Sequence, residues 1–167
     1  AMATIRSGHQ AVLLVVDVQV GVMADAWDAA RVIQNTARAV ERARGQGVPV
    51  IWVQHSDPDL VHGSPAWHWV PQLDPAPDEP MTHKHFNSSF EQTDLDDELA
   101  RLGATHLVLA GAATNWCIRS TAYGALERGY ESALDWALSH QWTTLAIAVA
   151  SFGVACGAGT QLGTEFF

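Results

Sequence analysis

The sequence predicts an α/β protein with parallel strands at its centre. Apolar runs at residues 11–16, 48–54 and 105–111 are rich in Val, Ile and Leu, as in strands that are covered on both faces. Segments with the apolar spacing of helices follow the first and third of these runs and precede the third. Such repeated alternation of strands and helices is typical of an α/β sheet.

The first 54 residues form a strand, helix, strand unit. The run at 11–16 ends at Asp17, which places an acid at the carboxyl end of the first strand. Between Asp28, a candidate N-cap, and residue 44, apolar residues recur every three or four positions. Gly45 and Gly47 then end the helix, and the second strand follows at 48–54.

The middle of the chain is less regular. Residues 55–80 are rich in Pro, Asp, His and Trp without a sustained period, which predicts a long surface loop of the kind that often carries function. "MTHKHF" at 81–86 is a short extended candidate. Thr93 is a candidate cap for a helix at 94–102, which Gly103 closes.

The third strand, 105–111, leads into a predicted helix at 115–128 that ends at Gly129. Beyond Tyr130, "TTLAIAVASF" fits either a strand or a buried helical segment, and the Gly-rich end has no clear period. Because no repeat or linker divides the chain, we expect a single domain over residues 1–167.

Charge and composition exclude several partners. The formal charge is −9 with nine Lys and Arg in 167 residues, which opposes binding to nucleic acid. No apolar run approaches the roughly 20 residues that cross a bilayer, and no leader pattern opens the chain, so we expect no membrane partner and a cytoplasmic location. We interpret Cys117 and Cys156 as free thiols.

Cys117 is the first candidate for chemistry. It lies in the first turn of a predicted helix capped by Thr114 or Asn115, where unpaired N–H groups and the helix dipole favour a thiolate and lower the thiol pKa. The alternative is a small apolar side chain in the core.

Asp17 and Lys84 are the other two candidates. Asp17 lies at the strand edge where open parallel sheets bind ligands, and Cys117 follows another strand to the same edge, as a base and a nucleophile must. The alternative for Asp17 is a turn or cap acid. Lys84 read by itself is a surface lysine.

Three segments resemble the signature stretches of the isochorismatase-like cysteine hydrolases, in order and separation: "LLVVDVQVGV", "KHFNSSFEQTDL" and "LVLAGAATNWCIRSTAYGALERGY". The resemblance covers roughly residues 10–130. It implies a catalytic triad of Asp17, Lys84 and Cys117, and a hydrolase that cleaves a small amide or related C–N bond through a thioester without a cofactor.

The same resemblance implies a doubly wound, three-layer α/β/α fold with a mostly parallel sheet, assembled as a homodimer or homotetramer. It also implies a cis peptide between Ala112 and Ala113, and an oxyanion hole formed by the N–H groups of Ala113 and Cys117. The tail after Glu131 departs from the family pattern, through divergence or through a shift of the reading frame near that residue.

Two other functions stand beside the amide hydrolase. One is an isochorismatase-type vinyl ether hydrolase, which the presence of Cys117 disfavours because those relatives typically lack the nucleophilic cysteine. The other is a binding or scaffold protein that kept the fold and lost turnover.

The aromatic and histidine residues complete the candidate site. We expect three tryptophans to line a pocket for a small-molecule substrate: Trp67, Trp69 and Trp116. Imidazole and carboxylate groups in the long loop raise the hypothesis of a metal site, but their spacing is poor, and we expect no metal at His55, Asp57, His62 and His68. His83 and His85 flank Lys84 and, in a strand, point to the opposite face, so neither is assigned a role.

Overall fold

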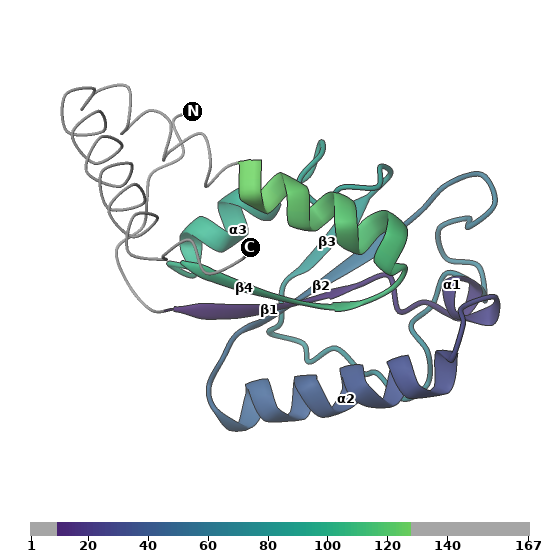
Figure 1. The fold of residues 1–167 in the computed structure, drawn as a ribbon, viewed down its shortest axis with the longest axis horizontal. Coiled ribbons are helices and arrows are strands. Elements are labelled where there is room, and N and C mark those ends of the chain that lie inside the picture. The colour runs from purple at the N-terminus through teal and green to yellow at the C-terminus, as the bar shows by residue number, and fades with distance from the viewer. Residues whose placement is uncertain (1–9, 128–167) are drawn as a thin grey trace, which may run out of the picture. The chain divides into compact units, whose positions relative to one another are not determined.

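Within the described residues, the central sheet contains four strands: β1 (Ala11–Val16), β2 (Val50–His55), β3 (Met81–Lys84) and β4 (His106–Gly111). Every neighbouring pair is parallel, and the order is β3-β2-β1-β4 (Figure 1). The structure is a computed structural model that describes residues 10–127, all of which belong to one compact unit. The predicted α/β fold with a parallel sheet is confirmed.

Helices cover both faces of this sheet. Helix α2 (Ala29–Gly45) packs on one face, and α3 (Leu95–Arg101) lies on the other with the helical segment that follows β4 (Figure 1). That segment begins as the π-helical turn η1 (Thr114–Ile118) and continues as an α-helix over residues 119–127. The described residues therefore form three layers.

Alternating side chains of β1 fill two separate cores. Leu13 and Val15 pack with Trp52 of β2 and with Val40 and Ala43 of α2. The intervening residues of β1 face the other layer and pack with a set that includes Leu95 and Leu99 of α3: Val12, Leu14 and Val16. Because both faces of β1 are covered, its sequence is a continuous apolar run rather than an alternating one.

Gly111 allows β1 and β4 to approach closely at their carboxyl ends. It pairs with Val16 in the sheet register and has a φ of 128°. A Cβ atom at position 111 would lie 2.0 Å from the Val16 carbonyl oxygen, so any larger residue would force the two strands apart.

Several helix starts differ from the predicted ones. Asp28 does precede α2, but it has a left-handed φ of 53° and its carboxylate pairs with Arg31 at 2.6 Å instead of capping a backbone N–H. The N-cap position of α3 is Asp94 rather than Thr93, but the Thr93 hydroxyl still accepts from the N–H of Leu95, the first residue of α3, at 3.4 Å and donates to the Ser89 carbonyl. The short helix α1 (Val20–Ala24) was not predicted, because five residues carry too little of a periodic pattern.

The predicted long loop runs between β2 and β3 without a helix or strand of its own. Gln19, which is fully buried, fixes this loop to the end of β1. Its amide donates to the carbonyls of His55 (3.0 Å) and Trp67 (2.8 Å), and its carbonyl accepts from the His55 N–H (2.9 Å). The loop is therefore held next to the carboxyl ends of the strands.

Some expectations lie outside the described residues. These are the strand or helix in "TTLAIAVASF", the end of the last helix at Gly129, and the free thiol of Cys156. The single domain over residues 1–167 likewise stays a prediction. Within residues 10–127, none of the helices has the length and hydropathy of a membrane-spanning segment.

Candidate active site

The predicted catalytic residues meet at the carboxyl edge of the sheet. Strands β2 and β3 extend the sheet from one side of β1, whereas β4 lies on its other side, so the chain changes direction between β1 and β4. Open α/β sheets bind ligands outside such a point. Asp17 follows β1 there, and Cys117 lies in η1, just after β4.

Lys84 reaches this point from β3, across the end of β2. Neighbouring strands lie about 4.8 Å apart, so β3 and β1 are separated by about 10 Å and a long side chain is needed to cross. Lys84 Nζ lies 2.7 Å from Asp17 Oδ2 and 3.3 Å from Cys117 Sγ. Lys84 and Asp17 are each 1% exposed, so this lysine belongs to a buried cluster with Asp17 and Cys117 rather than to the surface.

The Asp17 carboxyl is held in a strained turn and a poorly solvated position. Its φ is 53°, a left-handed conformation that non-glycine residues adopt at a cost of roughly 1 kcal/mol or more. Burial raises the pKa of Asp17, and the charge and hydrogen bond of Lys84 and a hydrogen bond from Cys117 oppose this increase only in part. A raised pKa suits a carboxylate that accepts a proton during a reaction.

Cys117 does not have the lowered pKa that its position suggested. Burial raises the pKa of the thiol to about 11, and the Asp17 charge adds to this increase, while Lys84 opposes it. The residue also lies in a π-helical turn whose N-cap is Ala113, not Thr114 or Asn115. The predicted lowering of the Cys117 pKa is therefore wrong, because desolvation and the neighbouring carboxylate outweigh the helix N-terminus.

The residues of the expected oxyanion hole lie together on the strand-to-helix connection. Ala113 is extended (φ −94°, ψ 144°) and directly precedes the turn that holds Cys117. The peptide bond between Ala112 and Ala113 is cis. Ala112 itself is buried against the core on the α2 face.

A pair of buried hydroxyl groups joins the Lys84 segment to the Cys117 segment. The Ser89 N–H donates to Thr121 Oγ1 at 3.0 Å, and the two hydroxyl oxygens lie 2.8 Å apart. Both residues are fully buried. Neither residue was predicted from the sequence, although "FNSSF" and "RSTAY" contain two clusters of small hydroxyl side chains near the motif residues.

The three tryptophans occupy different environments. Trp67 is packed, with its indole N–H donating to Ser56 Oγ at 2.8 Å and its ring stacked on His83 at 5.8 Å. Trp69 packs edge-on against Trp52 in the core, with centroids 5.0 Å apart. Trp116 is 62% exposed beside Cys117. Of the three, Trp116 alone has a largely exposed side chain.

The loop histidines are not gathered into a metal site. No group of three or more His, Cys, Asp or Glu side chains in residues 10–127 could hold a metal ion. The His62 ring instead packs against Trp67, with centroids 4.2 Å apart. His83 points away from Lys84, as the strand alternation predicted.

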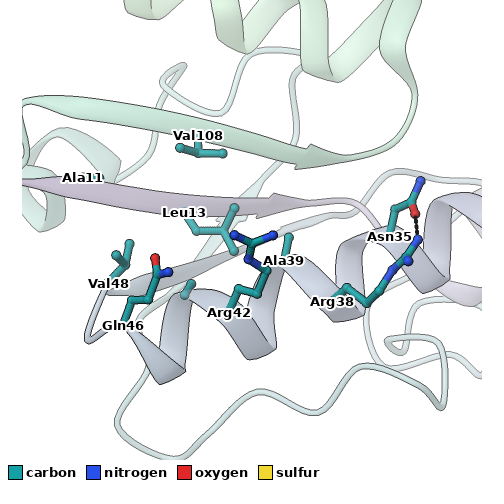
Figure 2. Close-up of a pocket in the computed structure, with 10 residues that line it drawn as sticks. Ala11, Leu13, Asn35, Arg38, Ala39, Arg42, Gln46, Val48 and Val108 are labelled. Atoms are coloured by element: carbon teal, nitrogen blue, oxygen red, sulfur yellow. Dashed lines mark hydrogen bonds between the residues drawn. The ribbon is translucent and has the colours of Figure 1, made fainter.

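A groove of about 580 Å³ lies elsewhere in the molecule. It runs between α2 and the β1–β4 pair, and Figure 2 shows side chains from both sides of it, including Leu13, Arg42 and Val108. None of Asp17, Lys84 and Cys117 lines it. The groove is therefore separate from the cluster at the carboxyl edge of the sheet.

The high pKa of Cys117 predicts the pH dependence of its alkylation. Only the thiolate reacts with iodoacetamide, so without substrate the rate should rise about tenfold per pH unit from pH 7 and level off near pH 11. Asp17→Asn should move the bend to lower pH, because it removes a charge that disfavours the thiolate. The measurement is mass spectrometry of the Cys117 peptide, and a plateau reached below pH 8 would contradict this assignment.

The fold and the cluster define an α/β protein with a cysteine, an aspartate and a lysine in contact at the switch point of its sheet. Residues 11–135, more than half of the chain, match the isochorismatase domain family. The chain belongs to this family, as the resemblance of its three motifs predicted.

Three relatives illustrate the similarity. Streptothricin hydrolase of Streptomyces noursei is 34% identical over 129 residues, which cover 73% of this chain and 51% of that protein. Ureidoacrylate amidohydrolase of Methylobacterium radiotolerans is 35% identical over 131 residues, which cover 59% of this chain and 51% of that protein. The crystal structure of N-carbamoylsarcosine amidase from Thermoplasma acidophilum is 27% identical, with a TM-score of 0.65 over 72% of this chain and 78% of that one. The chain thus spans about half the length of the curated relatives it matches.

Proposed function

We propose that this chain is a cysteine-dependent hydrolase that cleaves a small amide or related C–N bond through a thioester. The observation that carries the proposal is the contact of Lys84 Nζ with both Asp17 Oδ2 (2.7 Å) and Cys117 Sγ (3.3 Å). A nucleophile within reach of a base and an orienting cation is the arrangement that covalent acyl transfer needs. Relatives named as an amidohydrolase and an amidase support the choice of bond.

The first half of the reaction forms the acyl-enzyme. Asp17 takes the thiol proton as Cys117 Sγ attacks the carbonyl carbon, and the carbonyl oxygen becomes an oxyanion. When the C–N bond breaks, the leaving nitrogen takes the proton from Asp17 and departs as the amine. The raised pKa of Asp17 suits this exchange, because it makes the carboxylate a better acceptor of the thiol proton.

The second half releases the acid. Asp17 takes a proton from water as the oxygen attacks the thioester carbon, and the C–S bond breaks with return of the proton to sulfur. Lys84 stays cationic throughout and stabilises whichever of Asp17 and Cys117 carries the negative charge. This division of roles explains why the resting thiol can be protonated and the site still be reactive.

Backbone N–H groups of Ala113 and Cys117 stabilise the oxyanion in this mechanism. Both belong to the connection that carries the nucleophile, so they approach the attacked carbonyl together with the sulfur. One such donor is worth about 3 to 4 kcal/mol of barrier in acyl-transfer sites. Trp116, exposed beside Cys117, contributes an apolar surface to a small, partly flat substrate.

A panel of small amides tests the proposal: carbamoyl, ureido, lactam and nicotinamide compounds, assayed for release of ammonia or acid. At least one should be hydrolysed, and stopping the reaction in acid should trap an acyl adduct on the Cys117 peptide. Hydrolysis of a vinyl ether such as isochorismate, without any adduct on Cys117, would instead favour the alternative reaction.

We also propose that the chain assembles into a homodimer or homotetramer. Three large apolar or aromatic side chains on the segment after β4 are exposed in the described structure: Trp116, Tyr123 and Leu126. Exposed groups of this kind are typical of contact surfaces. Light scattering of the purified protein should give two or four times the mass of the chain, and a monomer at micromolar concentration would contradict this.

A further inference from the structure

The His55 side chain lies between Lys84 and a carboxylate that the mechanism does not use. His55 ends β2 and pairs in register with Lys84, the last residue of β3. Its Nδ1 is 3.4 Å from Lys84 Nζ, and its Nε2 is 3.1 Å from Asp57 Oδ2. The ring therefore links the buried cluster to the partly exposed Asp57.

The chemistry of the two neighbours determines the tautomer of His55. A lysine ammonium can only donate, so Nδ1 must accept from it. An ionised carboxylate can only accept, so Nε2 must carry the proton and donate to Asp57. Partial burial opposes ionisation of Asp57, but hydrogen bonds from the Leu60 N–H, from His55 and from the Asp59 N–H prevail and lower its pKa.

Hydrogen bonds from the surrounding structure hold both His55 and Asp57 in place. The backbone N–H and carbonyl of His55 are held by the buried amide of Gln19. Asp57 is fixed by its own turn, in which Oδ1 accepts from the N–H groups of Asp59 (2.8 Å) and Leu60 (2.6 Å). Asp57 Oδ2 is left to face the ring.

Lys84 needs such a partner because several groups compete for its three protons. Besides His55, Nζ lies close to Asp17 Oδ2, Cys117 Sγ and the Phe86 carbonyl oxygen, the last at 3.2 Å. The Phe86 carbonyl oxygen and His55 Nδ1 can each accept one of the three protons. The remaining proton can then be shared between Asp17 and Cys117, as the proposed reaction requires.

We propose that His55 and Asp57 are positioning residues for Lys84: Asp57 fixes the His55 tautomer, and His55 fixes the ammonium between Asp17 and Cys117. The consequence for catalysis rests on the proposed function. The geometry is independent of that function. The reactivity of the thiol is also independent of it, because this reactivity depends on where Lys84 lies and the Lys84 cation favours the thiolate.

Asp57→Asn separates this role from folding. The Asn Oδ1 keeps the turn to Asp59 and Leu60, but its amide nitrogen donates where Oδ2 accepted. The His55 proton is then driven to Nδ1, where it faces the Lys84 ammonium and displaces it. We expect alkylation of Cys117 by iodoacetamide at pH 8.5 to slow about tenfold or more, the size of a lost hydrogen bond to a charged group, and the bend of the pH profile to move upward.

Asp59→Asn is the matched control, because it makes the same change of charge two residues away on an exposed side chain. It should alter the alkylation rate by less than about twofold, since its contribution to the Asp57 turn is a backbone N–H. Thermal unfolding of both variants should remain close to that of the wild type, because the Asp57 side chain is 39% exposed.

Two variants of His55 test which ring nitrogen matters. His55→Asn places an acceptor near the Nδ1 position and should alkylate within about threefold of the wild type. His55→Gln places its amide near Nε2 and should be as slow as Asp57→Asn, by about tenfold. A purely structural role would not distinguish the two amides in this order.

Equal alkylation rates in Asp57→Asn and Asp59→Asn would overturn the inference, as would His55→Asn reacting as slowly as His55→Gln. If a His55 variant does not fold, the Asp57 and Asp59 pair still decides. If the alkylation rates differ in this way but the protein hydrolyses no amide, the proposed function is refuted and the positioning role stands.

Discussion

Cys117→Ala should reduce amide hydrolysis by about 10⁴-fold or more while the protein remains folded. The sulfur forms the covalent bond in the proposed mechanism, and loss of the nucleophile from a triad leaves only the contribution of binding and the oxyanion donors. The side chain is small and only partly buried beside the core on the α3 face, so the free energy of unfolding should change by about 1 kcal/mol. Steady-state kinetics and thermal unfolding provide the two measurements.

Cys156→Ala is the matched control for this experiment, because it removes the other thiol of the chain and should leave hydrolysis unchanged. Substantial turnover by Cys117→Ala would refute the thioester mechanism. No turnover by the wild type on any amide, together with a stable fold, would favour the non-catalytic binding protein.

Lys84→Met should destabilise the protein by about 3 to 5 kcal/mol at neutral pH and abolish hydrolysis. Methionine fills much of the same volume, so the main effect is on charge: the Asp17 carboxylate loses its cation 2.7 Å away and remains buried. Breaking one side of a buried ion pair has a cost of this size because an uncompensated charge is left in a poorly solvated position.

The double variant Asp17→Asn with Lys84→Met should recover most of this stability, since no buried charge remains. Denaturant unfolding of the wild type, both single variants and the double variant gives the coupling between the two sites. A double variant no more stable than Lys84→Met would show that the loss comes from packing and not from the unpaired carboxylate.

The effect of Lys84→Met should also depend on pH in a defined direction. Burial raises the pKa of Asp17 in the folded protein above the ordinary aspartate value of 3.8, and loss of Lys84 removes the main opposing influence. When the pKa of a carboxyl is higher in the folded than in the unfolded protein, its contribution to stability is fully present below the unfolded pKa. This stability is lost as the pH rises through the folded pKa. The variant should therefore be least destabilised near pH 4 and most destabilised at pH 7 and above.

The strands and the long helices could be predicted because their signals are local. β1 and β2 are buried on both faces and so read as unbroken apolar runs, and α2 carries a helical period over seventeen residues. The five residues of α1 and the π-helical form of η1 have no such signal. They depend on how the connections after β1 and β4 pack, which spacing alone does not encode.

The positions of Asp17 and Cys117 followed from a topological rule, since the carboxyl ends of parallel strands share one edge. Lys84 was different: as an isolated residue it resembled a surface lysine, and the family motif was needed to assign it. Its burial depends on β3 lying two strands from β1, so that the side chain must cross the end of β2. The order of the strands in the sheet sets this distance, and no local sequence pattern predicts it.

The amino-acid sequence by itself determined the α/β class, the family and the three residues of the candidate triad. The tertiary structure decided the electrostatics, because a pKa depends on desolvation and on charges brought from distant segments. It raised the pKa of Cys117 to about 11, where the local helix position had suggested a lower value. It also brought the His55 ring against Lys84, a contact between residues 29 positions apart that local sequence patterns do not record.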